Sequence, residues 1–244
     1  MGHIWKTGSA AVVGAAGGVG HALVRALSDD GDFKTVVALT RRPTDALPAG
    51  VRTGFVDLTD EASITQAAAE AGHAGDLRLV IVATGMLHGD GMMPEKNLRS
   101  LQPDHLARAF AINAIGPAMV AKHFLPRLPR TGETVFAALS ARVGSISDNR
   151  SGGWYAYRAS KAALNMLIRT LSIEFARTHP DGICVGLHPG TVDTRLSQPF
   201  QAGIPSGRLF TPEHSARCLL DVLDRLQPEQ TGGCFAWDGS PIAP

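Results

Sequence analysis

The sequence predicts an α/β fold, with one doubly wound parallel sheet of seven strands and helices on both of its faces. Short apolar runs alternate with helical patterns along the 244 residues, and this alternation is typical of that architecture. Several apolar runs are continuous, as in strands that are covered on both faces. Because no linker, repeat or low-complexity segment interrupts the alternation, we expect a single domain over residues 1–244.

The apolar runs and the patterns between them predict the elements in order. The expected strands are 10–13, 35–40, 51–56, 79–83, 134–139, 183–188 and 233–237. The expected helices lie near 18–29, 60–72, 103–125, 155–178 and 212–226. The last helix has the clearest start signal, because Thr211 can act as its N-cap and Pro212 can occupy its first position.

Composition and charge narrow the range of partners. The formal net charge is +1 without a block of like charges, so we expect neither nucleic acid nor a membrane surface as a partner. No apolar run reaches the ~18 residues of a membrane span, and the first residues lack the pattern of a signal peptide, which predicts a cytoplasmic location. Cys184, Cys218 and Cys234 each lie in an apolar run and are interpreted as buried thiols of a reducing compartment. Since no His/Cys cluster has the spacing of metal ligands, no metal is predicted.

A glycine-rich segment, GAAGGVG at 14–20, follows the first strand and opens the first helix. Glycines in that position permit a tight turn and let backbone N–H groups approach a pyrophosphate at the helix N-terminus. The position therefore favours dinucleotide binding over a purely structural turn. The spacing fits GxxxGxG through Gly14, Gly18 and Gly20, or GxxGxxG with Gly17 as the middle glycine. The glycines alone do not choose between these patterns.

The end of the second strand indicates which dinucleotide is bound. A site that prefers NAD usually has an acid about 20 residues beyond the glycine loop, whereas here Thr40 is followed by Arg41 and Arg42. A guanidinium binds a 2′-phosphate through charge-assisted, often bidentate bonds. The pattern favours NADP(H), with a solvated turn as the alternative.

The third strand ends in VDLT, which places Asp57 at the carboxyl edge of the sheet. A dinucleotide binds at that edge, so Asp57 could accept a hydrogen bond from the adenine amino group. It could equally cap the helix that follows. The two readings stay open.

The segment WYAYRASKAALN at 154–165 contains both tyrosines of the chain and a lysine. Residues four apart share a helix face and residues two apart do not. Tyr157 and Lys161 are therefore neighbours, while Tyr155 faces elsewhere. A nearby ammonium lowers the pKa of a tyrosine from ~10 toward working pH, which makes Tyr157 a candidate general acid for a carbonyl oxygen. An ordinary pair on a helix surface is the alternative.

The long helix before this segment contains Pro117 four residues after Asn113. Proline has no N–H, so the Asn113 carbonyl loses its intrahelical partner and the helix is expected to kink. The freed carbonyl could hold a water that resupplies protons to a lysine. A kink that serves packing is the alternative.

Taken together, these motifs resemble the short-chain dehydrogenase/reductase superfamily over nearly the whole chain. The resemblance rests on GAAGGVG, VDLT, NAIG, LSARVGSI, YAYRASKAALN and HPGTVDT, in the family's order and spacing. The stretches GSISDN and YRASKAALN and the short C-terminus are most similar to the C-factor or sniffer-like carbonyl reductase group. The resemblance implies a single-domain Rossmann fold and hydride transfer between NADPH and a small to medium carbonyl compound.

The resemblance also assigns roles to residues. Tyr157 would be the acid/base, Lys161 would lower its pKa and hold the nicotinamide ribose hydroxyls, and Asn113 would anchor the relay water through its carbonyl. HPGTVDT would embrace the nicotinamide, Asp57 would contact adenine, and Tyr155 is left as packing or pocket wall. The implied cofactor contacts are Gly14, Gly18, Val19, Gly20, Thr40, Arg41, Asp57, Leu58, Gly85, Tyr157, Lys161, Pro189, Gly190, Val192 and Thr194.

Two departures from the family pattern lie on the cofactor side. Val13 occupies the position of the threonine that usually precedes the first glycine, which removes a side-chain hydrogen bond near the loop. The usual Asn-Ala-Gly after the fourth strand is replaced by ATG, so Thr84 and Gly85 stand in. We expect that turn still to support the adenosine side.

The third departure concerns the catalytic serine. The family pattern places it three residues before Gly144, where this chain has Ala141, with Ser140 one position earlier. Adjacent strand residues point in opposite directions, so a bulge would be needed to turn Ser140 inward. Ser140 is the preferred catalytic serine, and Ser145 is the next candidate.

The expected substrate pocket is formed by 86–93, Trp154 and 195–210, which are mixed apolar and polar and carry little charge. It fits a hydrophobic aldehyde or ketone. His88 either touches this substrate or is a solvated loop histidine.

The apolar residues of helix 155–178 occupy more than one stripe, which predicts a homo-oligomer, dimer or tetramer, through this helix. A single broad buried face is the alternative. The rival functions are an NADP-binding sensor without turnover and an NAD-dependent alcohol dehydrogenase.

Overall fold

The computed structural model describes residues 8–42, 44, 47–89 and 91–244. Seven parallel strands form one sheet in the order β3-β2-β1-β4-β5-β6-β9, which confirms the predicted doubly wound sheet. Every strand boundary lies within two residues of its predicted position. The strands are β1 (Ser9–Val13), β2 (Thr35–Thr40), β3 (Arg52–Phe55), β4 (Leu77–Val82), β5 (Thr134–Leu139), β6 (Gly182–His188) and β9 (Cys234–Ala236).

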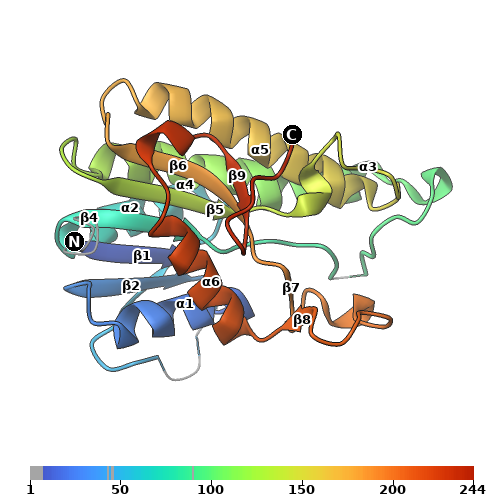
Figure 1. Ribbon diagram of the computed structural model, residues 1–244, viewed down its shortest axis with the longest axis horizontal. Helices are drawn as coiled ribbons and strands as arrows, with labels where there is room; N and C mark the ends of the chain where they lie inside the picture. Colours follow the sequence, from blue (N-terminus) through green and yellow to red (C-terminus); the bar gives the residue numbers. More distant parts are fainter. Residues whose placement is uncertain (1–7, 43, 45–46, 90) are drawn as a thin grey trace.

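Helices cover both faces of the sheet (Figure 1). α1 (Gly18–Asp29) and α6 (Pro212–Leu223) pack on one face. The other face is covered by α2 (Glu61–His73), α4 (Gly116–Phe124) and α5 (Tyr155–Phe175). Successive strand residues enter opposite cores, so Ala10 and Val12 face α1 and α6 while Ala11 and Val13 face the other helices. This alternation explains why the strands are continuously apolar.

The predicted helix 103–125 is interrupted near Pro117. It consists of α3 (Pro103–Phe110), a π-helical turn η3 (Ala111–Ile115) and α4. In the π turn the Gly116 N–H donates to the Ala111 carbonyl, one residue further back than in an α-helix. The expected break in the hydrogen-bond ladder is thus present as a π turn, next to the residue that lacks an N–H.

Short elements complete the chain. The one-turn helices are η2 (Leu98–Ser100), η4 (Leu125–Arg127), η5 (Arg142–Gly144), η6 (Gln198–Phe200) and η7 (Pro228–Gln230). β7 (Thr191–Val192) and β8 (Leu209–Phe210) pair with each other as a separate two-stranded sheet. Residues 1–7, on which the signal-peptide prediction bears, and Asp90 of the expected pocket loop lie outside the described residues.

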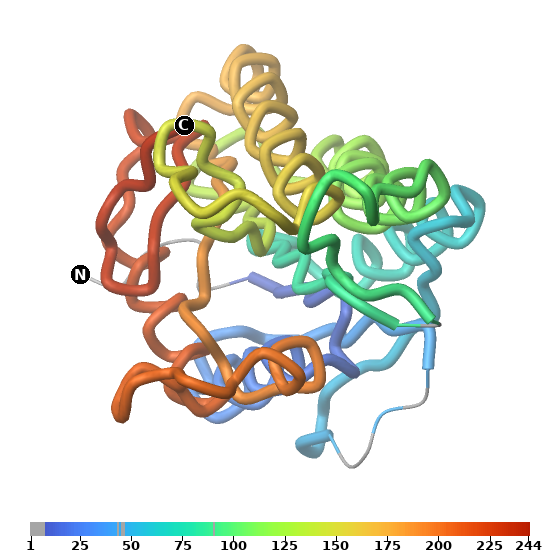
Figure 2. The backbone as a smooth tube through the Cα atoms, turned by 90° about the vertical axis from the view of Figure 1, so that its right-hand side faces the viewer, coloured from blue at the N-terminus to red at the C-terminus, as the bar shows by residue number. Residues whose placement is uncertain are grey.

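The order of the strands determines where a ligand can bind. β1 lies between β2 and β4, so the chain winds outward in both directions from β1, and a crevice opens at the carboxyl ends of these strands. Figure 2 views this edge, where segments 91–100, 140–153 and 190–210 surround the strand ends from different sides. Among the described helices, none is long and apolar enough to cross a membrane.

Candidate active site

The glycine loop between β1 and α1 is tightly packed at three of its glycines. Gly14 has a φ of +93°, and a Cβ at Gly20 would overlap the Gly14 carbonyl oxygen. A Cβ at Gly18 would lie 2.6 Å from Thr194 Cγ2, whereas one at Gly17 would meet nothing closer than the Gly14 carbonyl oxygen at 3.3 Å. The steric requirement for glycine therefore follows the GxxxGxG spacing.

The packing of Gly18 against Thr194 brings the segment after β6 over the glycine loop. In that segment Gly190 has a φ of +79°, and the Pro189 carbonyl accepts a hydrogen bond from the Ser215 hydroxyl at 2.8 Å. The two motifs are more than 160 positions apart in the sequence. Even so, the structure brings these predicted cofactor contacts to one edge of the sheet.

Two predicted contacts serve packing as well. The Val19 side chain packs against the core formed with α1 and α6. Leu58 lies against Gly116, where a Cβ would come within 2.8 Å of Leu58 Cδ1.

Arg41 and Asp57 form an ion pair at the ends of β2 and β3, with Arg41 Nη1 3.6 Å from Asp57 Oδ2. The pKa of Asp57 is lowered, chiefly because its carboxylate accepts a hydrogen bond from the Thr59 N–H, while burial opposes this effect and Arg41 adds to it. Asp60, and not Asp57, caps α2 by accepting from the Ala62 N–H at 3.0 Å. The capping role considered for Asp57 is thus excluded.

Thr40 stabilises the turn that presents the two arginines. Its hydroxyl donates to the Arg42 carbonyl at 2.8 Å and accepts from the Arg42 N–H at 3.2 Å. The Arg41 side chain is 53% exposed, so its guanidinium is accessible to an anionic group at this corner.

The turn after β4 contains a buried hydroxyl without a partner, which bears on whether an adenine dinucleotide fits this edge of the sheet. Thr84 Oγ1 is buried and has no hydrogen-bond partner among the described residues, although a buried hydroxyl ordinarily has one. The Thr84 methyl group lies against Gly14, and a Cβ at Gly85 would lie 3.7 Å from Lys161 Nζ. An orphan hydroxyl beside a glycine-lined cradle fits a polar ligand that lies across the loop.

Tyr157 and Lys161 lie on one face of α5, as predicted. Lys161 is 2% exposed, and its Nζ donates to the Leu139 carbonyl at 2.7 Å and lies 5.9 Å from the centroid of the Tyr157 ring. Burial lowers the pKa of Lys161 to about 8.

The expectation that Lys161 lowers the pKa of Tyr157 is wrong for the structure as it stands. Burial raises the pKa of Tyr157 to about 12, because a phenolate loses more hydration than a phenol. The Lys161 ammonium is directed at the Leu139 carbonyl instead of the phenol. Tyr157 therefore keeps its proton at neutral pH.

Asn113 has a side-chain role that the sequence did not predict. It is fully buried, its Oδ1 accepts from the Met86 N–H, and its Nδ2 donates to the Met86 carbonyl, both at 2.8 Å. Nδ2 also donates to Ser160 Oγ at 3.0 Å. Asn113 thereby connects the π turn to the loop after β4 and to α5. The role predicted for its main-chain carbonyl stays a prediction.

The structure does not bring either candidate serine to Tyr157. Ser140 Oγ donates to Asn165 Oδ1 on α5 at 2.6 Å. The β5–β6 register runs without a shift from Thr134 to Leu139, and Ser140 continues it. Because β5 contains no bulge, strand alternation directs the Ser140 side chain away from the side to which Ala141 points. Ser145 contacts the C-terminal segment and Asp148 instead.

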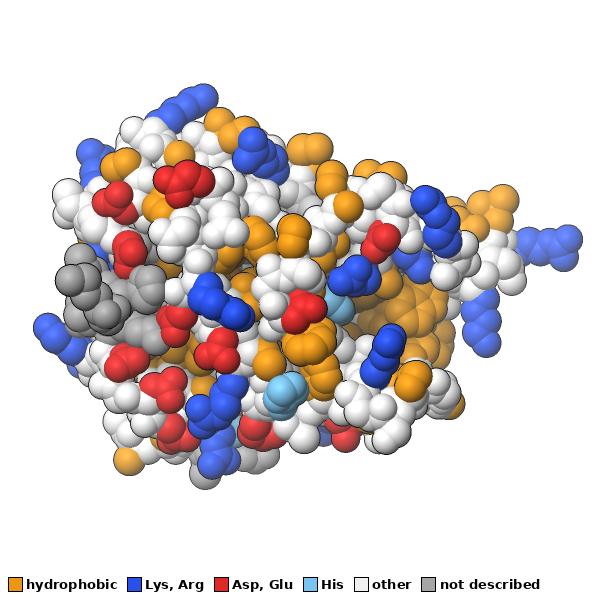
Figure 3. Space-filling view, viewed as in Figure 1, with side chains coloured by type: hydrophobic (Ala, Val, Ile, Leu, Met, Phe, Trp, Pro, Cys, Tyr) orange, Lys and Arg blue, Asp and Glu red, His pale blue; other side chains and the backbone are white. Residues whose placement is uncertain are grey.

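Aromatic rings form one side of the cleft next to Tyr157. The Trp154 ring centroid lies 6.3 Å from that of Tyr157 and 5.1 Å from that of Phe200. The His88 ring contacts Phe200 at 5.7 Å, and its Nε2 donates to the Arg195 carbonyl at 2.9 Å. His88 is therefore part of the wall. Figure 3 shows an apolar hollow on this side of the molecule, with Lys and Arg side chains around it.

Tyr155 is not part of this wall. Tyr155 is 37% exposed, and α5 directs it away from the Tyr157 face.

All three cysteines are free, but only Cys184 is buried, because Cys218 and Cys234 are partly exposed. The expectation of three buried thiols was thus correct for one. Among the described residues, no group of three or more His, Cys, Asp or Glu side chains could hold a metal ion.

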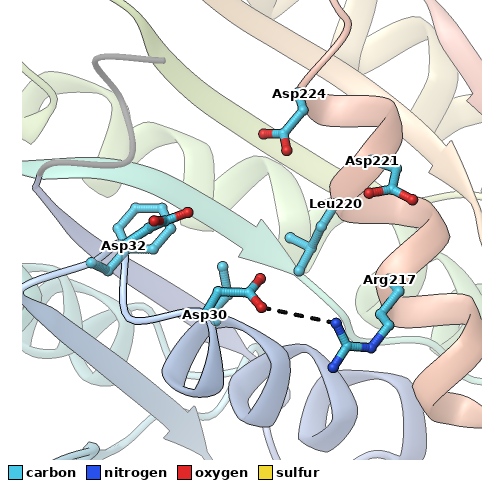
Figure 4. Close-up of a pocket in the computed structure, with 8 residues that line it drawn as sticks. Asp30, Asp32, Arg217, Leu220, Asp221 and Asp224 are labelled. Carbon is cyan, nitrogen blue, oxygen red and sulfur yellow. Dashed lines mark ion pairs between the residues drawn. The ribbon is translucent and has the colours of Figure 1, made fainter. Parts of the chain in front are cut away.

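A cavity of about 200 Å³ lies between the C-terminal halves of α1 and α6 (Figure 4). Its lining is acidic, and Arg217 Nη1 lies 3.9 Å from Asp30 Oδ1 across it. α1 starts at the glycine loop, so its C-terminal end lies at the opposite edge of the sheet. This cavity is therefore separate from the site at Tyr157.

Comparisons with known proteins identify the family of this chain. The family model for short chain dehydrogenases matches residues 9–204. The chain is 41% identical over 138 residues to C-signal of Myxococcus xanthus, covering 56% of this chain and 77% of that protein. It is 32% identical over 231 residues to 1-hydroxy-2-glutathionyl-2-methyl-3-butene dehydrogenase of Rhodococcus sp. (strain AD45), covering 94% of this chain and 96% of that protein.

Solved structures show the same fold. NADPH-bound carbonyl reductase from chicken fatty liver superposes with a TM-score of 0.83 at 25% identity, covering 96% of this chain and 93% of that one. Carbonyl reductase Sniffer of D. melanogaster superposes with a TM-score of 0.82 at 24% identity, covering 96% and 98%.

Proposed function

The chain belongs to the short-chain dehydrogenase/reductase family of oxidoreductases, and we propose that it reduces small to medium carbonyl compounds with NADPH. The proposal rests on one observation. Three buried or half-buried side chains lie close together at the edge of the sheet that carries the glycine loop. A Cβ at Gly85 would lie 3.7 Å from Lys161 Nζ and 3.8 Å from Asn113 Oδ1, and Tyr157 adjoins Lys161 on α5. These groups meet where a dinucleotide binds in such a sheet.

NADPH, when bound, supplies a hydride to the carbonyl carbon. The chain would hold it through the backbone of 14–20, the Thr84–Gly85 turn and the segment after β6. Lys161 is the buried cation next to this cradle and would hold the ribose hydroxyls. The NADPH bound to the chicken carbonyl reductase supports this choice of cofactor.

Tyr157 would supply the proton. Its phenol gives a proton from Oη to the carbonyl oxygen while the carbonyl carbon gains a hydride, and an alcohol results. The pKa of about 12 ensures that the proton is present beforehand. The phenolate that remains is stabilised by the Lys161 ammonium, which must turn from the Leu139 carbonyl toward the ring. The aromatic wall of Trp154 and Phe200 would hold the apolar part of the substrate.

Arg41 would decide between NADP(H) and NAD(H). Its exposed guanidinium at the end of β2 suits a 2′-phosphate, and its ion pair with Asp57 orients it there. We expect Arg41→Ala to raise the KM for NADPH by about tenfold or more and to leave the KM for NADH nearly unchanged. Initial rates with each cofactor, for wild type and variant, would show this. Equal effects on both cofactors would contradict the assignment.

A second function has support from two observations. No described hydrogen bond joins the hydroxyl of Ser140 or Ser145 to the Tyr157 phenol, and one similar protein is named C-signal. A protein that binds NADP(H) without turnover is therefore the rival. The Rhodococcus relative is named a dehydrogenase of a hydroxy compound, so the direction of the reaction is to be tested both ways.

The deciding experiment follows NADPH absorbance with a panel of aldehydes, ketones and diketones, for wild type and Tyr157→Phe side by side. We expect turnover in the wild type and a loss of about 10²- to 10⁴-fold in the variant. NADPH binding, measured by fluorescence, should be the same in both proteins. Tight binding without turnover in either protein, with alcohols and NADP⁺ also inert, would favour the rival.

A further inference from the structure

Helix α5 starts without an N-cap side chain of its own. Trp154 occupies the cap position with φ 50° and ψ 43°, and its side chain makes no capping hydrogen bond. It is the one described residue other than glycine with a positive φ, a strained backbone conformation for a bulky side chain. The first N–H groups of a helix nevertheless need acceptors.

Glu95, from the loop after β4, supplies an acceptor for one of these N–H groups and another for the cap residue itself. Its Oε2 accepts from the Ala156 N–H at 3.1 Å, and its main-chain carbonyl accepts from the Trp154 N–H at 2.5 Å. Glu95 is 2% exposed. Burial of a carboxylate is costly unless it is hydrogen-bonded, and a negative charge at a helix N-terminus is favourable. One residue thus caps α5 and holds the strained Trp154.

The two groups that Glu95 holds both belong to the candidate active site. Ala156 precedes Tyr157 in the first turn of α5, and the Trp154 indole forms the aromatic wall. Glu95, Ala156 and Tyr157 also line one small cavity, together with Met86. Asn113 holds the same loop at Met86. The loop is therefore attached to the catalytic machinery near both of its ends.

We propose that Glu95 is a positioning residue. By capping α5 from a distance it sets the direction of the first helical turn, and hence of the Tyr157 phenol, and it keeps the Trp154 indole in place as a wall. A local cap such as Ser or Asp at position 154 would satisfy the helix but would remove that wall. The effect on turnover rests on the proposed carbonyl reduction, whereas the effect on Trp154 does not.

The test compares Glu95→Ala, which removes the acceptor, with Glu95→Gln, which keeps an oxygen where Oε2 lies. We expect kcat to fall about 10²-fold in Glu95→Ala, because a small misplacement of a reacting group has that effect. Glu95→Gln should stay within about fivefold of wild type, and the KM for NADPH should be unchanged in both. If Glu95→Ala does not fold, Glu95→Asp replaces it, because its shorter side chain withdraws the acceptor from Ala156.

Asp60→Ala is the matched control, because Asp60 caps α2 through an equivalent bond to the Ala62 N–H at 3.0 Å. Asp60 is exposed whereas Glu95 is buried, so we expect Asp60→Ala to lower the Tm less than Glu95→Ala does and to leave kcat unchanged. Equal kcat values for Glu95→Ala and Asp60→Ala would overturn the proposal while carbonyl reduction stood. Equal impairment of Glu95→Gln and Glu95→Ala would also overturn it, because an acceptor oxygen would then not suffice.

A readout without turnover separates this proposal from the proposed function. Trp154 fluorescence, isolated by subtracting spectra of the matching Trp154→Phe variants, should shift to longer wavelength in Glu95→Ala and not in Glu95→Gln. That shift would support the positioning of Trp154 even if no carbonyl compound were reduced. An unchanged Trp154 spectrum in Glu95→Ala would overturn the proposal.

Discussion

The protonation of single residues in the site depends on how deeply each side chain is buried. Burial raises the pKa of Tyr157 to about 12 and lowers that of Lys161 to about 8, because each charged form loses hydration. At neutral pH the phenol is therefore protonated and the ammonium charged. This is the pair of protonation states that carbonyl reduction requires.

The expected pH dependence of the proposed carbonyl reduction follows from these two pKa values. A lysine with a lowered pKa is charged below that pKa, so kcat should be constant near neutral pH and decline above about pH 8 as Lys161 loses its proton. Tyr157 still holds its proton there. Lys161→Arg stays charged, so its decline should lie at higher pH. Profiles of kcat at saturating NADPH test this, and identical declines in both proteins would contradict it.

Two substitutions test whether Ser140 takes part in catalysis or only stabilises the fold. Ser140→Ala removes the donor to Asn165, so it should lower the free energy of unfolding by about 1–3 kcal/mol and change kcat by less than about threefold. Ala141→Ser adds a hydroxyl where the family pattern has one and should raise kcat about tenfold. Urea unfolding and initial rates measure both effects. A large loss of kcat in Ser140→Ala, with a normal fold, would instead identify Ser140 as the catalytic serine.

Among the elements, the glycine loop depends on a partner remote in sequence. Gly18 is required because Thr194 packs on it at the other side of the site, while Gly17 faces more open space. Pro117 has a comparable effect on its helix, since the adjacent π turn places Asn113 between Met86 and Ser160. In both cases one residue permits the local backbone conformation, and a different residue makes the contact that depends on it.

A pair of alanine substitutions tests the glycine pattern. Gly18→Ala would place a Cβ 2.6 Å from Thr194 Cγ2, so it should weaken NADPH binding by about tenfold or more. Gly17→Ala has an accessible φ of −80° and a nearest contact of 3.3 Å, so its Kd should stay within about threefold. Fluorescence titration with NADPH measures both. The reverse ranking would show that the loop uses the GxxGxxG spacing.

For the whole molecule, α5 presents an apolar surface on the side away from the sheet. Met166 is 66% exposed and Ile173 is 50% exposed, and residues seven apart share a helix face. Exposed apolar side chains on one face are typical of an interaction surface. The predicted homo-oligomer through this helix is therefore consistent with the exposure of α5 and remains a prediction.

Oligomerisation can be tested by placing a charge on α5. We expect the wild type to be a dimer or tetramer and Met166→Lys to shift it toward the monomer, because a buried unpaired charge is unfavourable. Leu98→Lys is the control, since Leu98 is 70% exposed on η2. Light scattering during size-exclusion chromatography gives the masses. A monomeric wild type, or equal effects of both substitutions, would contradict the prediction.

Much of the fold and part of the site could be predicted because their signals are local. Continuous apolar runs identify strands, and a four-residue spacing identifies the face shared by Tyr157 and Lys161. The roles of Glu95 and the Asn113 side chain could not be predicted, since each depends on contacts with distant segments. The direction of the Ser140 side chain depended on whether β5 contains a bulge, which the sequence pattern left open.

The sequence by itself determined the sheet of seven strands, the glycine loop, the Tyr157–Lys161 pair and the break at Pro117, because periodicity, spacing and missing N–H groups are properties of the chain. Only the tertiary structure decided which glycines are sterically required, where the serine hydroxyls point and how far burial shifts the pKa of Tyr157 and Lys161. These outcomes depend on the distance between atoms far apart in sequence and on the water excluded between them, and no local pattern contains either quantity.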